Sequence, residues 1–272
     1  MNEIIRNPWT RLRSFTNARL ALGRAGDSLP TNEVLEFALA HAKARDAVHN
    51  TLDVESLAHD LKASGLPSIA LQSSARDRAE YLRRPDLGRK LNSESRARLE
   101  ETFMKETKNC HPERSKGPAF STHLCHSEAL SAAFIIADGL SSIAPQRHAI
   151  PVLRDIISKL GDQHIAPVII ATQARVAIGD EIGELLNAEM TIVLIGERPG
   201  LSSPDSLGIY LTYKPHVGCT DADRNCISNV RPQGLSYEAA ARKLHHLMLA
   251  ARRTGQSGIA LKDESDRPSL TP

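Results

Sequence analysis

The sequence predicts an α/β fold, in which a mostly parallel sheet with flanking helices follows a small N-terminal helical region. Three short apolar runs carry this prediction, at residues 132–137, 166–171 and 190–195. Each run is bounded by turn residues, and a helical pattern follows the first two. Such runs are typical of strands that are buried on both faces of a parallel sheet. The predicted arrangement is therefore Rossmann-like.

The first hundred residues have the periodicity of helices. Thr31 can cap a helix, and Glu33 places an acid in its first turn. An apolar stripe follows at helical spacing, which predicts an amphipathic helix. Its members are Val34, Phe37, Ala38, His41, Ala44 and Val48. We interpret His41 as a hydrogen-bonded core or boundary residue, and residues 80–91 as a solvated helix-turn-helix whose basic side chains could instead hold an anion.

The second half of the chain alternates between strands and helices. We expect a helix over about 145–159, an acid-bearing helix that follows residues 176–178 and runs through Leu186, and a further strand at 207–213. A last helix over about 237–253 shows one apolar face, and Gly255 is a typical stop signal.

Two segments fit neither pattern. Residues 105–128 are highly charged and lack apolar periodicity, and the last ten residues are polar. We therefore divide the chain into a helical region (1–102), a disordered insertion (103–130), a Rossmann-like binding domain (131–262) and a disordered tail (263–272).

Composition excludes several classes of function. The 272 residues carry a formal charge of only +2, and no segment combines basic and aromatic residues as a nucleic-acid groove would. No apolar run approaches the roughly 18 residues that cross a bilayer. The N-terminus lacks the apolar core of a secretory signal, and the 4 cysteines fit a reducing cytoplasm.

Familiar catalytic and metal-binding motifs are absent or imperfect. Cys110-His111 and Cys125-His126, with His123, have zinc-ligand chemistry, but adjacent ligands splay away from a single ion. Asp162-Gln163-His164 is similar to the start of the D-x-H-x-x-G motif, in which the histidine ligates the cobalt of cobalamin. It precedes its strand instead of following it, however, and Pro167 stands where the motif has glycine. The sequence has no G-x-S-x-G elbow, P-loop or G-x-G-x-x-G fingerprint. We therefore predict neither catalytic residues nor a metal site.

Polar residues gather where the predicted strands end. Asp138 follows the first strand, Arg175 and Val176 follow the second, and Glu197 and Arg198 follow the third. Because open α/β sheets bind ligands at the carboxyl ends of their strands, we expect these residues to share a rim. The rim has no evident nucleophile or acid–base pair, which favours binding a large, amide-rich ligand over reacting with a small one.

The motifs that carry this rim resemble a known family, the small subunits of ethanolamine ammonia-lyase. The resemblance covers nearly the whole chain outside about 103–130. It is strongest at residues 179–184 (GDEIGE), 195–207 (IGERPGLSSPDSL) and 220–229 (TDADRNCISN). Shorter matches lie at 23–26 (GRAG), 84–89 (RPDLGR), 138–141 (DGLS) and 257–258 (SG).

The resemblance implies a protein that works within a hetero-oligomer. In that family, a large TIM-barrel subunit holds ethanolamine, and the small subunit closes over adenosylcobalamin (coenzyme B12) at the interface. The complex is an ammonia-lyase that converts ethanolamine to acetaldehyde and ammonia, and the cofactor supplies the radical chemistry. Family members are found in the cytoplasm, some of them inside bacterial microcompartments.

Three residues are implied as cofactor contacts. Val176 would give apolar contact to the corrin, Glu197 would accept hydrogen bonds from its amides or a ribose hydroxyl, and Cys226 would pack against it. Each has a simpler structural interpretation: Val176 as a core strand residue, Glu197 in an ion pair with Arg198 or another basic group, and Cys226 as buried filler. Alternative functions are a stand-alone α/β nucleotide-binding or oxidoreductase domain and a non-catalytic scaffold.

Overall fold

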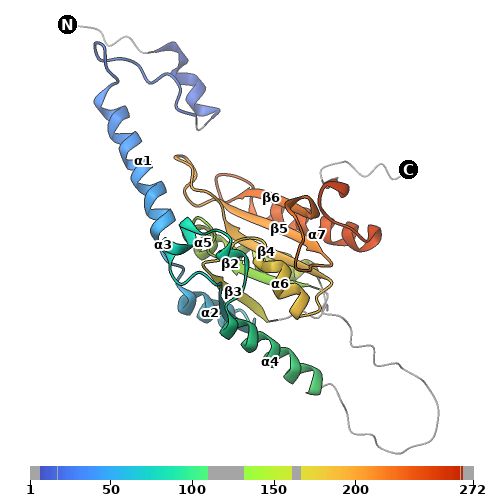
Figure 1. The fold of residues 1–272 in the computed structure, drawn as a ribbon. Helices are drawn as coiled ribbons and strands as arrows, with labels where there is room; N and C mark the ends of the chain where they lie inside the picture. Colours follow the sequence, from blue (N-terminus) through green and yellow to red (C-terminus); the bar gives the residue numbers. More distant parts are fainter. Residues whose placement is uncertain (1–6, 17, 110–131, 161–166, 264, 266–272) are drawn as a thin grey trace, which may run out of the picture.

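A six-stranded sheet forms the centre of the computed structural model, which describes residues 7–16, 18–109, 132–160, 167–263 and 265 (Figure 1). The strand order is β1-β3-β2-β4-β5-β6. The strands are β1 (Ser68–Gln72), β2 (Ala133–Ala137), β3 (Val168–Thr172), β4 (Met190–Gly196), β5 (Leu207–Tyr213) and β6 (Arg224–Val230).

The sheet is mostly parallel, as the sequence predicts. The pairs β1/β3, β2/β3 and β2/β4 are parallel, whereas β5 pairs antiparallel with both β4 and β6. Only β5 therefore runs against the other described strands. As a result, β1, β2, β3, β4 and β6 all end at the same edge of the sheet.

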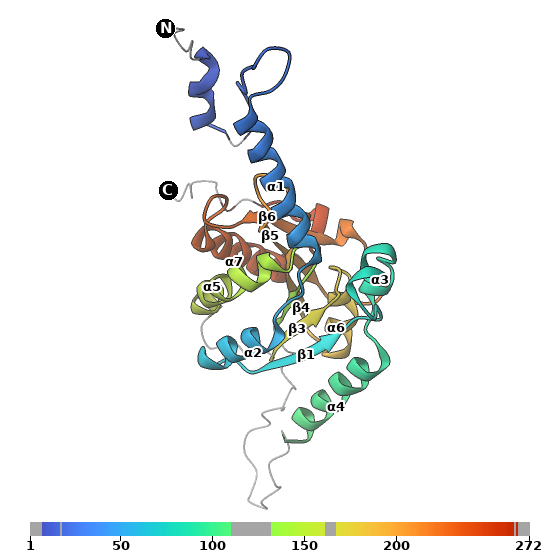
Figure 2. The ribbon, with the colours of Figure 1, turned by 90° about the vertical axis from the view of Figure 1, so that its left-hand side faces the viewer.

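Helices cover both faces of this sheet (Figures 1 and 2). One apolar core lies between the sheet and α2, α5 and α7, and a second lies between the sheet and α4 and α6. The α-helices are α1 (Thr31–His49), α2 (Val54–Ala63), α3 (Arg78–Arg83), α4 (Ser93–Asn109), α5 (Ile143–Leu160), α6 (Ile178–Leu185) and α7 (Tyr237–Thr254). Short 3₁₀ helices are η1 (Pro8–Ser14), η2 (Leu87–Arg89), η3 (Asp221–Asp223) and η4 (Gly258–Ala260).

The ends of α7 show how local sequence sets an element. The Ser236 hydroxyl accepts the backbone N–H of Ala239, which satisfies a donor in the first turn. At the other end, Gly255 adopts a left-handed conformation with φ of 70°, which glycine tolerates without a steric cost. The predicted stop at Gly255 is thereby confirmed.

The structure changes the predicted boundaries. The region 1–102 is not purely helical, because β1 lies within it and pairs with β3. Helix α4 continues through 103–109, so that part of the predicted insertion is ordered, while residues 110–131 lie outside the described residues. In the predicted tail, Asp263 accepts hydrogen bonds from Lys243 and from the backbone of Ser265.

Helix α1 departs most from its prediction. It does not lay its apolar stripe on the core but projects from the body together with η1 (Figure 2). Val34, Phe37 and Leu39 are 49%, 46% and 56% exposed, and His41 is exposed and stacks on Phe37 instead of lying at a core boundary. The projection, residues 7–49, is called the N-terminal arm below.

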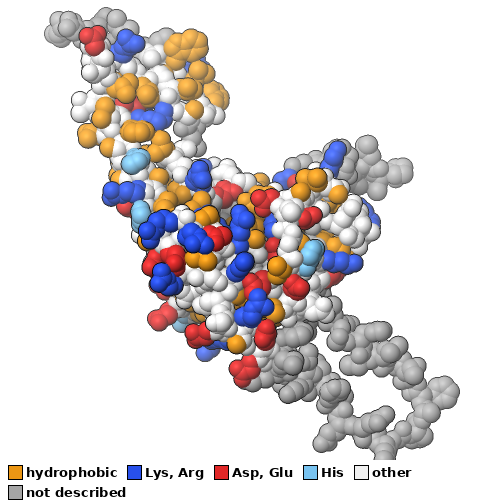
Figure 3. Space-filling view, in the orientation of Figure 1, with side chains coloured by type: hydrophobic (Ala, Val, Ile, Leu, Met, Phe, Trp, Pro, Cys, Tyr) orange, Lys and Arg blue, Asp and Glu red, His pale blue; other side chains and the backbone are white. Residues whose placement is uncertain are grey.

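The N-terminal arm is nevertheless braced internally. Glu33 is buried, and its carboxylate lies 2.6 Å from Arg13 and 3.6 Å from Arg19. Arg19 also donates to the Glu33 carbonyl oxygen and lies over the Phe37 ring. These contacts fold η1 and the following segment back onto the first turns of α1. Hydrophobic side chains gather on this part of the surface (Figure 3).

Candidate functional site

The candidate site is a depression at the edge where the parallel strands end. The chain after β2 enters α5 on one face of the sheet, and the chain after β3 enters α6 on the other. Such divergence opens a crevice at the carboxyl ends of neighbouring strands, which is where open α/β sheets bind ligands. The depression has a volume of about 350 Å³, and its lining comes from the loops after β2, β3 and β4 and from β5.

Two glycines form its floor. The N–H of Leu140 donates to the Gly196 carbonyl oxygen at 3.0 Å, so the loops after β2 and β4 touch backbone to backbone. A Cβ atom on Gly139 would lie 2.2 Å from the Gly196 oxygen, and one on Gly196 would lie 1.9 Å from the Ser141 oxygen. Neither contact is possible for a side chain, so this close approach requires glycine at both positions.

Asp138 ties the first two loops together. Its carboxylate accepts the backbone N–H groups of Gln173 and Ala174, both at 2.8 Å, and lies 3.3 Å from the guanidinium of Arg78. Burial raises the pKa of Asp138, and these three donors act in the opposite direction. The predicted gathering of Asp138 with the residues after β3 is confirmed, but Asp138 faces the protein and acts as a clamp.

Arg78 connects the depression to the N-terminal arm. Besides Asp138, its guanidinium donates to the carbonyl oxygens of Gly139 at 2.8 Å and Leu140 at 3.1 Å. Its Nε donates to Val48 near the end of α1 at 2.6 Å. Sequence reasoning did not single out Arg78, because an arginine in a short surface helix has no distinctive local signal.

Glu197 lies in the depression but makes no ion pair with Arg198 among the described residues. Its carboxylate accepts hydrogen bonds from the hydroxyls of Ser206 and Ser228, and from the backbone N–H of Asn229 at 3.3 Å. Within the described part of the chain Glu197 pairs with no other basic side chain either, so the simpler interpretation, an ion pair with Arg198 or another basic group, is wrong. The two hydroxyls hold Glu197 at the rim, where part of its acceptor capacity remains open to a ligand.

Tyr210 shares the lining of the depression with Val176 and is paired with Cys226 on the neighbouring strand. Val176 is half-buried and lines the depression, as does Tyr210 on β5. Cys226 is exposed on β6, directly opposite Tyr210 in the strand register, so it is not the buried filler of the simpler interpretation. The surrounding protein raises the pKa of its thiol by desolvation, which keeps the sulfur protonated and suits packing better than nucleophilic attack.

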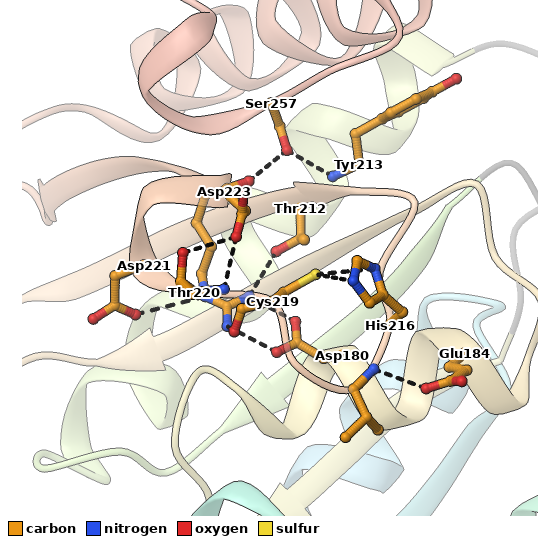
Figure 4. Close-up of polar contacts among 12 residues, drawn as sticks. Asp180, Glu184, Thr212, Tyr213, His216, Cys219, Thr220, Asp221, Asp223 and Ser257 are labelled. Carbon is orange, nitrogen blue, oxygen red and sulfur yellow. Dashed lines mark hydrogen bonds and ion pairs between the residues drawn. The ribbon is translucent and has the colours of Figure 1, made fainter.

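A buried ion pair joins Arg224, the first residue of β6, to Asp180 on α6, and it connects the motifs at 220–229 and 179–184. Figure 4 shows Asp180 and the polar residues around it. Arg224 donates to both carboxylate oxygens of Asp180, at 2.6 and 2.7 Å, and also to Thr212 and to the Cys219 carbonyl oxygen. Burial raises the pKa of Asp180, and its contact with Arg224 acts in the opposite direction. This pair fixes the start of β6, and therefore the position of Cys226. The Cys219 thiol lies 3.3 Å from His216 at the edge of the same cluster.

The remaining candidate motifs are not part of this site. Cys110, His111, His123, Cys125 and His126 lie outside the described residues, as does the Asp162-Gln163-His164 triplet. Among the residues that the structure describes, no group of three or more histidine, cysteine or acidic side chains could hold a metal ion. Within the same residues, no helix is long and apolar enough to span a membrane.

Comparison with known proteins agrees with the resemblance seen in the motifs. The family model for the ethanolamine ammonia-lyase light chain (EutC) matches residues 6–262. A protein of Azotobacter vinelandii named ethanolamine ammonia-lyase small subunit is 51% identical over 262 residues, which cover 96% of this chain and 90% of that protein.

Two further relatives carry the same name. The protein of Xanthomonas campestris pv. campestris strain B100 is 51% identical over 97% of this chain and 91% of its own length. That of Pseudomonas putida strain KT2440 is 50% identical over 97% of this chain and 90% of its own length. With a family model matched across nearly all of its length and relatives at this identity, the chain belongs to the ethanolamine ammonia-lyase light chain family, the small subunits of a two-chain ammonia-lyase.

Proposed function

We propose that this chain binds adenosylcobalamin in the depression at the carboxyl edge of its sheet, at an interface with a large TIM-barrel subunit. The complex would convert ethanolamine to acetaldehyde and ammonia. The observation that carries the proposal is that Val176 and Glu197, whose role as cofactor contacts the resemblance implies, line one depression, with Cys226 beside it. The location of the protein, in the cytoplasm or in a microcompartment within it, stays a prediction from the resemblance.

The lining fits the chemistry of a corrinoid. Leu140, Val176 and Ile195 supply apolar surface, and Glu197, Arg175 and Arg198 supply polar groups around it. A corrin has an apolar macrocycle edged with amide side chains, so it needs both kinds of surface. The depression is open and smaller than such a ligand, which is consistent with a second subunit enclosing the rest.

Each residue would have a binding role. Val176 would contact the macrocycle, Glu197 would accept hydrogen bonds from an amide or a ribose hydroxyl, and Cys226 would fill the space beside Tyr210. Ser206 and Ser228 would hold Glu197 in place by donating to it. When held by these residues, the cofactor would supply the radical chemistry of the reaction. The residues of this chain orient the ligand and exclude water from its edge.

The N-terminal arm supports a hetero-oligomer. Trp9, Phe15 and Leu35 are 64%, 82% and 64% exposed, although the arm is braced by its own ion pairs. Large apolar patches on a folded surface are typical of protein–protein interfaces. The arm is also joined to the rim of the depression through Arg78, so one partner could cover both.

Co-expression with the large subunit tests the proposal. We expect ethanolamine-dependent acetaldehyde release only when both chains and adenosylcobalamin are present. Turnover by the large chain alone would contradict it.

A matched pair of variants tests the site. Val176→Asn should weaken cyanocobalamin binding to the complex by at least about fivefold, because it places a polar group against the macrocycle. Val217→Asn, at a 64% exposed valine outside the depression, should leave binding unchanged.

A further inference from the structure

Two arginines line the depression without a neutralising partner. Arg175 follows β3 and Arg198 follows β4, and both belong to the lining. Among the described residues, neither guanidinium has a hydrogen-bonded or ion-paired carboxylate. The Nε atom of Arg175 is buried and has no hydrogen-bond partner. The lining therefore carries two guanidinium groups against one carboxylate, that of Glu197, and neither guanidinium is paired with it.

Two buried arginines near the site each have a carboxylate partner: Arg78 lies against Asp138, and Arg224 lies against Asp180. The Nε atom of Arg224 also has no hydrogen-bond partner, so Arg175 differs from Arg224 in having no carboxylate beside its guanidinium. Buried polar atoms in native proteins are nearly always hydrogen-bonded, so an unpartnered one needs an explanation. For Arg175, this explanation is a hydrogen-bond acceptor that belongs to a ligand and not to this chain.

Arg175 is also held in place from below. Its guanidinium stacks on the ring of Tyr81 at 4.4 Å from the ring centroid, and Arg78 lies 4.8 Å from the same centroid. Tyr81 is completely buried, and its hydroxyl donates to the Ala174 carbonyl oxygen at 3.0 Å. A Cβ atom on Gly88 would lie 2.8 Å from the ring, so the ring is closely confined. The backbone N–H of Arg175 donates to Gly88 at 2.7 Å.

We propose that Arg175 and Arg198 form an anion subsite that binds a phosphodiester group of the ligand, and that Tyr81 is the positioning residue for Arg175. Guanidinium groups match the geometry and charge of phosphate oxygens. Cobalamins carry one phosphodiester, in the nucleotide loop, and their other peripheral groups are neutral amides. The proposal rests on the function proposed above. Because the stack fixes Arg175 before the ligand arrives, little conformational entropy is lost on binding.

Two probes separate the phosphodiester from the corrin ring. Cyanocobalamin contains the nucleotide loop, and dicyanocobinamide has the same ring without the loop or its phosphate. Binding of each to the assembled two-chain complex is measured by ultrafiltration and absorption spectroscopy. We expect Arg175→Ala to weaken cyanocobalamin binding by about 10- to 100-fold and to change dicyanocobinamide binding by less than about twofold. Arg154→Ala, at an exposed arginine on α5, is the matched control and should change neither.

Variants of Tyr81 test the positioning role. Tyr81→Leu removes the aromatic face beneath Arg175 and should reproduce part of the loss for cyanocobalamin alone. Tyr81→Phe keeps that face and should restore most of the binding. A general loss of structure would instead weaken both probes together, and that result would overturn the positioning role.

The outcomes distinguish the anion subsite from the proposed cofactor-binding function on which it rests. If the unmodified complex binds neither probe, the proposed function fails and the subsite fails with it. If it binds both but Arg175→Ala weakens both equally, or neither, the phosphodiester assignment alone is overturned. Should Arg175→Ala not assemble, Arg198→Ala, at an exposed position, must show the same selective loss, and its absence would likewise overturn the proposal.

Discussion

Replacing Arg224 with methionine tests whether its buried ion pair with Asp180 stabilises the fold. The side chains of Arg224 and Asp180 are only 3% and 5% exposed, and two short hydrogen bonds join them. Methionine keeps much of the length of arginine but leaves the Asp180 carboxylate buried without its cation. Removing one partner of a buried pair costs about 3–5 kcal/mol, and we expect the free energy of unfolding in urea to fall by that amount.

A double-mutant cycle separates the pair from its surroundings. Combining Arg224→Met with Asp180→Leu removes both charges, so the double variant should lose less stability than the sum of the two single variants, by about 2 kcal/mol or more. The control is Arg242→Met, which breaks an exposed pair with Glu238 on α7 and should cost no more than about 0.5 kcal/mol. A loss below about 1 kcal/mol for Arg224→Met, or additive effects in the cycle, would refute the reasoning.

Two further predictions concern the floor of the depression and the packing of α5. Gly196→Ala should lower the free energy of unfolding by about 1–3 kcal/mol in the same urea assay, because its Cβ would meet the Ser141 carbonyl oxygen at 1.9 Å; an unchanged midpoint would contradict this. Burial lowers the pKa of His148, against the opposing charge of Asp205, so the unfolded chain binds the extra proton first as pH falls. The stability that this histidine contributes should be complete above about pH 6.5 and decline below it. His148→Asn should therefore reduce the change of the thermal unfolding midpoint between acidic and neutral pH. If the midpoint changes with pH as much in the variant as in the unmodified chain, His148 is not the source of that pH dependence.

The predictability of the sheet follows from burial. Strands β2, β3 and β4 are buried on both faces, so they stand out as apolar runs. Strand β1 is only half-buried at the sheet edge, and its sequence, SIALQ, is too short and mixed to show a period. Strand β6 buries Arg224, Ile227 and Val230 and exposes polar residues, so it resembles a loop in the sequence. Edge strands therefore account for both strands that the prediction missed.

The site was predictable for the same topological reason, and only in part. Residues that follow neighbouring parallel strands must meet at one edge, which brings Glu197 and Val176 together. Glu197 is held by Ser206, which directly precedes β5, and by Ser228 on β6. Their approach depends on antiparallel pairing between distant segments, for which the local sequence has no signal. Tyr210 was missed because an aromatic residue in a strand is expected in any sheet.

Helix α1 shows why an amphipathic pattern predicts a buried face without identifying what buries it. The stripe around Phe37 has the spacing of a core-facing helix, yet only the last turns of α1 contact the body, where Ala47 is completely buried. Arg19 lies over the Phe37 ring, but Val34 and Phe37 remain 49% and 46% exposed. Because Arg78 donates to the carbonyl oxygen of Val48 at the end of α1 and to that of Gly139 at the rim of the depression, it links the arm to the rim. A partner that covers the exposed stripe would therefore lie beside the depression, as the proposed function expects of a cofactor bound between two subunits.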